Sequence, residues 1–178
     1  MNGNPSGNGL KGVWLKLQPK LHLMVLLPVL PVLVSAPFLL LGRRLRDNAS
    51  VWDLLHVYLG LVLVPISILL LISCVVQGRW RQFFPLWGSD ALRQDLKALA
   101  SARLPKGGGS GLFSLLEGLC ALLLVAVALT GLGWYCTEGS AEALSWRAWH
   151  KDLAIGFVVL LALHVLAALS HLLDFFRQ

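Results

Sequence analysis

The segment that decides the fold is WHKDLAIGFVVLLALHVLAALSHLL, residues 149–173. It is long and apolar enough to cross a membrane as one helix, because a bilayer core about 30 Å thick needs about 20 apolar residues. It nevertheless contains three histidines, and an imidazole that only faced lipid would be costly there. The segment therefore predicts a membrane helix whose histidines have a binding role inside the protein.

The rest of the chain has the same character. Of its 178 residues, 57% are hydrophobic and 13% are charged, too few charges to cover a soluble domain of this length. Four expected spans cover residues 21–41, 54–77, 112–134 and 149–173, each of about the length that a bilayer requires. The sequence thus predicts an all-α, integral membrane four-helix bundle over residues 15–178. A disordered tail rich in Gly and Asn is expected over residues 1–14.

The basic residues predict how these helices are oriented. With four spans, the N-terminus, the loop 78–111 and the C-terminus share one side, and that side carries ten of the fifteen Lys and Arg residues. The positive-inside rule places this side in the cytoplasm. We therefore expect a multi-pass protein with both termini cytoplasmic. The net charge of +6 reflects topology and contact with anionic lipids of the bilayer, and a nucleic-acid partner is not implied.

All five histidines lie in or beside the expected spans. They are His22 in the first, His56 in the second, and His150, His164 and His171 in the fourth. At about 100° per residue, the three in the fourth span form one stripe along the helix. Polar groups in a membrane bundle usually face its interior and have a function, so we expect this stripe to face the bundle interior.

The depths of four histidines match in pairs. The first helix runs outward while the second and fourth run inward, so His56 and His150 lie near the outer surface, and His22 and His164 near the cytoplasmic one. Along the fourth helix, His164 is about 21 Å deeper than His150. Two stacked bis-imidazole pairs are what two b-type haems require, and a six-coordinate iron favours electron transfer over oxygen binding. The four histidines are therefore candidate axial ligands of the iron in an outer and an inner haem b, enclosed by the bundle.

Small residues support haem over another metal site. Gly60, Ala154 and Ala168 each follow a candidate ligand by four residues. This is the same helix face, where a bulky side chain would collide with a porphyrin. Zinc would require cysteines or carboxylates in register, and the sequence has none. The CxxCH motif for covalent attachment is also missing, so non-covalent haem b is the expected cofactor.

Together these features resemble the bacterial di-haem cytochrome b subunits. That group includes the gamma subunit of formate dehydrogenase, related hydrogenase and thiosulfate-reductase subunits, and prokaryotic cytochrome b561. The resemblance covers about residues 15–175 and rests on the four spans and the histidine pair fourteen residues apart in the last. The loop WRQFFPLWGSDALRQDLKAL and the LTG at 129–131 are most similar to the formate dehydrogenase gamma type. The resemblance implies the same ligand pairs, quinone reduction near the inner haem, and a bacterial inner membrane.

Other polar residues have several interpretations. His171 continues the stripe as an interfacial residue, a rival ligand for the inner haem, or a neighbour of quinone. Glu117, early in the third span, is a candidate proton donor to quinone. Arginines near both membrane surfaces suit interfacial electrostatics and are also candidate partners of haem propionates. These are Arg43, Arg44 and Arg46 on the outer side and Arg79 on the inner side.

Three functions are compatible with this pattern. The first is a di-haem cytochrome that moves electrons across the bilayer between a redox partner and the quinone pool, as a subunit of a respiratory oxidoreductase; the loop similar to formate dehydrogenase favours it. The second is a stand-alone superoxide:quinone oxidoreductase of the cytochrome b561 type, with which the basic run GRRLR at 42–46 is compatible. The third is a non-redox bundle whose histidines make interhelical hydrogen bonds or carry protons.

Overall fold

Four long helices make up most of the part of the chain that the structure describes. The computed structural model describes residues 20–76, 80–84, 90–101 and 111–177, with side chains up to residue 169. The long helices are α2 (Leu21–Ser35), extended by the 3-10 turn η2 (Ala36–Phe38), α3 (Val51–Val76), α6 (Leu112–Cys136) and α7 (Glu142–Arg177). Each is long and apolar enough to cross a membrane. The predicted all-α bundle of four membrane helices is confirmed, while the tail predicted over residues 1–14 lies outside the described residues.

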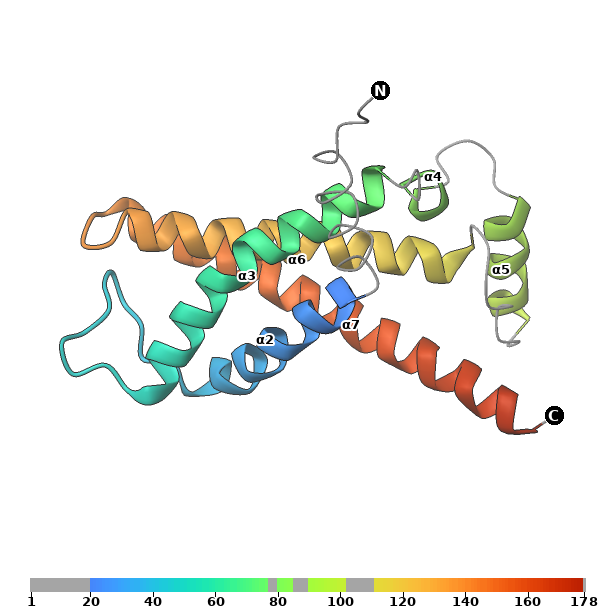
Figure 1. Ribbon diagram of the computed structural model, residues 1–178, viewed down its shortest axis with the longest axis horizontal. Helices are drawn as coiled ribbons and strands as arrows, with labels where there is room; N and C mark the ends of the chain where they lie inside the picture. The colour runs from blue at the N-terminus through green and yellow to red at the C-terminus, as the bar shows by residue number, and fades with distance from the viewer. Residues whose placement is uncertain (1–19, 77–79, 85–89, 102–110, 178) are drawn as a thin grey trace, which may run out of the picture.

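The long helices form two hairpins. Helix α2 packs on α3, α6 packs on α7, and α3 joins the two hairpins by packing on α6 (Figure 1). The loop 39–50 and the turn 137–141 lie together at one end of the bundle, which we call the outer end after the predicted orientation. The short helices α4 (Trp80–Phe83) and α5 (Asp90–Ala100) lie toward the other end, the inner end.

All four long helices differ from their predicted bounds, most of all at the start of α7. Helix α7 begins at Glu142, seven residues before the predicted span, because the segment before the apolar run is also packed: Ala143 is fully buried and its N–H lies 3.4 Å from Ser140 Oγ. The first span ends at Phe38 instead of residue 41. Pro37 lies in its final 3-10 turn, after which Leu39 is extended.

A buried apolar layer lies at mid-height in the bundle. It takes one residue from each long helix: Val29, Leu63, Leu124 and Phe157. Three of them, Val29, Leu63 and Phe157, each follow a candidate ligand histidine by seven residues, about two helical turns. The layer therefore separates the outer level of candidate ligands from the inner one.

The outer loop 39–50 is fastened to the α6–α7 turn. The indole N–H of Trp134 donates to the carbonyl oxygen of Gly42 at 3.0 Å. The backbone N–H of Gly139 donates to the carbonyl oxygen of Arg43, also at 3.0 Å. The N–H of Leu45 donates to the carboxylate of Glu138. Gly139 has a φ of +86°, a conformation in which a glycine is favoured. These contacts link the two hairpins across the outer end.

A buried carboxylate organises the start of α3. Asp53 is 2% exposed and accepts hydrogen bonds from the N–H of Leu40 at 2.9 Å and of Ser50 at 3.1 Å. The hydroxyl of Ser50 donates to the same carboxylate and accepts the N–H of Asp53. This reciprocal pattern is a capping box, in which two residues three apart satisfy the free N–H groups at a helix start.

Helix α5 is attached to the start of α6 in a similar way. It begins at Asp90 and ends at Ala100. Its Asp95 is buried and accepts a hydrogen bond from the N–H of Leu112 at 2.8 Å. Leu96 and Leu99 of α5 are exposed, as expected of a helix that lies on a membrane surface.

Candidate haem-binding site

The structure brings the two predicted outer ligands together. His56 is in the second turn of α3 and His150 is in the third turn of α7. Their ring centroids are 6.2 Å apart and the ring planes are nearly perpendicular, at 82°. Both imidazoles are half-buried near the outer end of the bundle. The depth argument from the sequence therefore placed this pair at the same level.

Each imidazole is oriented by a backbone carbonyl on the other helix of its hairpin. His56 Nδ1 lies 3.1 Å from the carbonyl oxygen of Val32 in α2, and His150 Nδ1 lies 2.9 Å from that of Val127 in α6. Because a carbonyl oxygen only accepts, the proton of each neutral ring is assigned to Nδ1. Nε2 is then the unprotonated nitrogen of both rings, which is the form that binds a metal.

The spacing of the pair fits two ligands on opposite sides of one iron. With metal–imidazole bonds of about 2 Å, the two ring centroids are about 6 Å apart. A free metal ion would require more ligands, and the part of the chain with described side chains has no group of three His, Cys, Asp or Glu residues able to hold one. A haem supplies four ring nitrogens itself, so two histidines complete its coordination.

Small residues lie near this pair on three helices. A Cβ added to Gly60, one turn after His56 on α3, would meet no atom within 4 Å. Gly131 in α6 instead lies against the ligand: its added Cβ would be 3.2 Å from His150 Cε1. Ala154, one turn after His150, is half-buried. Small side chains at these positions would leave room for a haem held by His56 and His150.

The predicted inner ligands are placed differently. His22, in the first turn of α2, is exposed, and His164 on α7 is half-buried. Among the described side chains, neither makes a hydrogen bond or a ring contact with the other or with a third residue. Ala168, the small residue after His164, is exposed. The inner pair therefore remains a prediction from the sequence.

The remaining predicted site residues are scattered. Glu117 is half-buried in α6 near the inner end, and the arginines of the outer loop are exposed. His171 belongs to α7, but its side chain lies outside the described part of the structure. Arg79 also lies outside the described residues. None of these residues is brought to the His56–His150 pair by a described contact.

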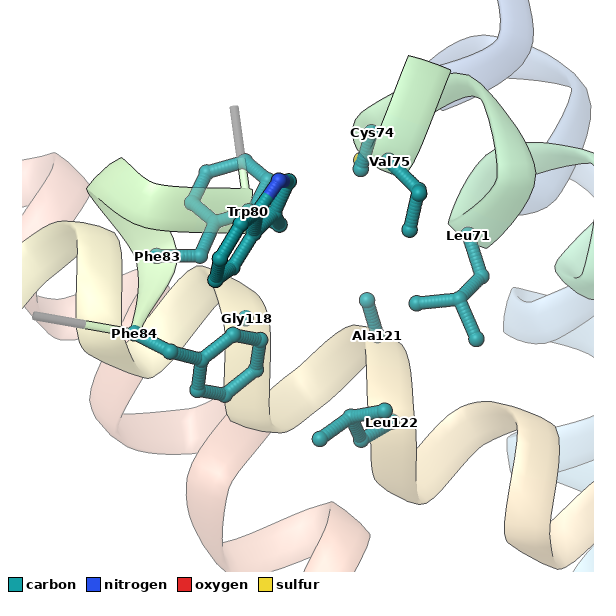
Figure 2. A pocket seen from close by; sticks show the side chains of 9 residues that line it. All are labelled: Leu71, Cys74, Val75, Trp80, Phe83, Phe84, Gly118, Ala121 and Leu122. Carbon is teal, nitrogen blue, oxygen red and sulfur yellow. The ribbon is translucent and has the colours of Figure 1, made fainter. Parts of the chain in front are cut away.

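A separate apolar cavity of about 300 Å³ lies between α3, α4 and α6, away from the outer pair. Figure 2 shows Trp80 and Phe84 on one side of it and Leu71 and Val75 on the other. Gly118 lets α4 approach α6, since an added Cβ would lie 2.8 Å from two phenylalanines. Among its lining residues only the indole of Trp80 and a cysteine thiol are polar, so the cavity suits a hydrocarbon chain better than a polar ring.

Sequence reasoning missed the residues that orient the candidate ligands. Ser35 Oγ lies 3.1 Å from His56 Nδ1, and Thr130 Oγ1 lies 3.4 Å from His150 Nδ1. Both hydroxyls are buried, at 0% and 8% exposed. A polar residue inside an apolar span was the available signal, since such residues are seldom idle.

An apolar four-helix bundle with a bis-histidine site of this spacing defines a class of protein, the membrane-embedded b-type cytochromes. The comparison with family models agrees: residues 18–174 match the model described as prokaryotic cytochrome b561. Because the match covers most of the chain, the protein belongs to this family, and the resemblance to bacterial cytochromes b is confirmed. No curated protein and no solved structure matches the chain.

Membership of this family settles the coarser points. The protein is a membrane b-type cytochrome that takes part in electron transfer, and haem b is its cofactor. Four apolar helices and a prokaryotic family fit a protein of the bacterial inner membrane.

Proposed function

We propose that the protein binds two haem b groups and moves electrons across the bilayer between a redox partner and the quinone pool. The outer haem would be held by His56 and His150, and the inner haem by His22 and His164. In this role the chain is the cytochrome b subunit of a respiratory oxidoreductase, with both termini in the cytoplasm. The observation that carries the proposal is the 6.2 Å spacing of the crossed outer imidazoles, each with Nε2 free for iron.

When bound, each haem supplies an iron that alternates between ferric and ferrous states. The chain's own contribution is to hold two neutral imidazoles at a fixed separation and to exclude competing ligands. Fourteen residues between His150 and His164 set the two sites about 21 Å apart along α7. The apolar layer that contains Leu63 and Phe157 keeps water out of the space between them.

The inner end would exchange electrons with quinone. A two-electron reduction of quinone consumes two protons, and Glu117 of α6 is a carboxyl at this end that can supply one. The apolar cavity beside Ala121 and Leu122 is available to an isoprenoid tail, although its lining does not include this carboxyl. His171 is the other candidate neighbour of a quinone ring.

Haem stoichiometry tests the ligand assignment. The protein is purified in detergent, and haem per chain is measured together with a reduced-minus-oxidised spectrum. We expect two haems and a b-type α-band. His56→Ala and His150→Ala should each lose the same haem, while His22→Ala and His164→Ala should each lose the other.

His171→Ala is the matched control, since His171 lies on the same helix, seven residues after His164. It should retain both haems. If this variant lost a haem and His164→Ala retained both, the inner ligand on α7 would be His171 and not His164. A wild-type protein without a b-type α-band would refute the electron-transfer function altogether.

A second function is favoured by a separate observation. The exposed Arg43, Arg44 and Arg46 belong to a loop that is fastened above the outer pair, and the family model is that of cytochrome b561. An exposed basic loop attracts small anions such as superoxide. Two superoxide ions would each give one electron and leave as O₂, and the two electrons with two cytoplasmic protons would reduce quinone to quinol.

Purification from native membranes separates the two functions. A stoichiometric hydrophilic redox subunit that copurifies supports the subunit role. Superoxide-dependent reduction of a soluble quinone by the chain alone supports the second role. In that case, changing the three arginines to glutamine should lower the rate and remove its dependence on ionic strength.

A further inference from the structure

The two outer imidazoles are held by the same local device on two different helices. In α2, the carbonyl oxygen of Val32 and the hydroxyl of Ser35 both lie 3.1 Å from His56 Nδ1. In α6, the carbonyl oxygen of Val127 lies 2.9 Å and the hydroxyl of Thr130 3.4 Å from His150 Nδ1. In each case the hydroxyl residue follows the carbonyl residue by three positions, so both groups lie on one helix face.

The hydroxyl protons are already used elsewhere. Ser35 Oγ donates to the carbonyl oxygen of Val32 at 2.8 Å, and Thr130 Oγ1 lies 2.9 Å from the carbonyl oxygens of Ala126 and Val127. Toward the imidazole, each hydroxyl oxygen is therefore an acceptor. The N–H of each ring faces two acceptors, and the pair of acceptors fixes the direction of the ring plane as well as its position.

We propose that Ser35 and Thr130 are positioning residues, which clamp His56 and His150 in their crossed orientation and tune the outer haem through them. This inference rests on the proposed binding of haem by these two histidines. The clamp of each ring is the carbonyl and hydroxyl pair described above. It holds the rings at 82° to each other.

The clamp has two consequences for the haem. An acceptor on Nδ1–H increases the basicity of an imidazole and thereby stabilises the ferric form over the ferrous form. Removing one of two acceptors should therefore raise the midpoint potential. The angle between two axial imidazole planes also sets the anisotropy of the EPR signal of a low-spin ferric haem. Crossed rings give a highly anisotropic signal, and rings that turn toward parallel give a more rhombic one.

The test uses variants that remove one hydroxyl while keeping the shape of the side chain. Ser35→Ala and Thr130→Val are compared with the wild type by redox titration and EPR of the purified protein. Ser67→Ala is the matched control, because Ser67 is 1% exposed and donates to the carbonyl oxygen of Val64 at 3.0 Å in the same back-bonded way. No described hydrogen bond joins Ser67 to a histidine.

Both test variants should raise the potential of the same haem, the one lost in His56→Ala, and should make its EPR signal less anisotropic. Ser67→Ala should leave both properties unchanged. If a test variant fails to retain this haem, Ser35→Thr or Thr130→Ser, which restores the hydroxyl, should regain it. Failure of that rescue would overturn the clamp.

The two proposals fail in different ways. Absence of haem from the wild type, or full haem content in His56→Ala, would refute the ligand assignment and the clamp with it. Full haem content in both test variants with unchanged potential and EPR signal would overturn the clamp alone. A fall in the potential would overturn the assignment of the hydroxyls as acceptors.

Discussion

Replacing Asp53 by alanine should destabilise the outer end of the bundle. The carboxylate is 2% exposed and accepts three hydrogen bonds, two of them from the backbone N–H groups of Leu40 and Ser50. A hydrogen bond to a charged acceptor contributes about 1.5–3 kcal/mol. Leu40 is 66% exposed, so water can hydrate its N–H after the substitution. We therefore expect the free energy of unfolding to fall by about 2–4 kcal/mol, less than the full value of the two backbone bonds.

Two further variants make the prediction specific. Asp53→Asn keeps one acceptor oxygen and loses the negative charge at the start of α3, so it should cost about 1–2 kcal/mol. Asp47 is an exposed aspartate in the loop before α3, and Asp47→Ala should change stability by less than about 0.5 kcal/mol. The protein in detergent micelles is titrated with dodecyl sulfate, and its unfolding is followed by far-ultraviolet circular dichroism. Equal stability of Asp53→Ala and Asp47→Ala would refute the reasoning.

Three other substitutions test contacts elsewhere in the bundle. Gly133→Ala should lower the free energy of unfolding by about 1–3 kcal/mol in the same assay, because the new Cβ would lie 2.6 Å from the ring of Trp146. Gly42→Ala, whose Cβ would meet no atom within 4 Å, should leave the stability unchanged. Asp95→Ala should detach α5 from α6 and make the amide hydrogens of α5 exchange about tenfold faster or more, and unchanged exchange would contradict this attachment. Gly60→Leu should lower the haem content while the haem-free chain unfolds as the wild type does; full haem content would show that no porphyrin lies over this helix face.

The sequence was most informative where one physical requirement dominates. Membrane-length apolar runs and the depths implied by their alternating directions were enough to predict four helices and the meeting of His56 with His150. The start of α3 was also readable, since Ser50 and Asp53 have the spacing of a capping box. Hydropathy instead placed the start at residue 54, because the cap residues are polar and precede the apolar run.

Other features depend on how helices rotate and approach each other, which spacing along one chain does not specify. Depth alone was the basis for pairing His22 with His164, but the exposure of His22 depends on how α2 is rotated. The roles of Ser35 and Thr130 likewise follow from contacts between helices that are distant in sequence. The start of α7 depends on packing beyond the apolar run, so hydropathy placed it seven residues too late.

The division of the bundle into two hairpins bears on how the cofactor is acquired during biogenesis. The pairs α2–α3 and α6–α7 are each formed by neighbouring segments, so each can enter the bilayer as a unit while the chain is synthesised. In both proposed haem sites, one ligand comes from each hairpin. Haem would then be captured only after the second hairpin has docked and the outer loop has been fastened to its turn. Haem capture would thus act as a checkpoint for assembly, marking chains whose two halves have met.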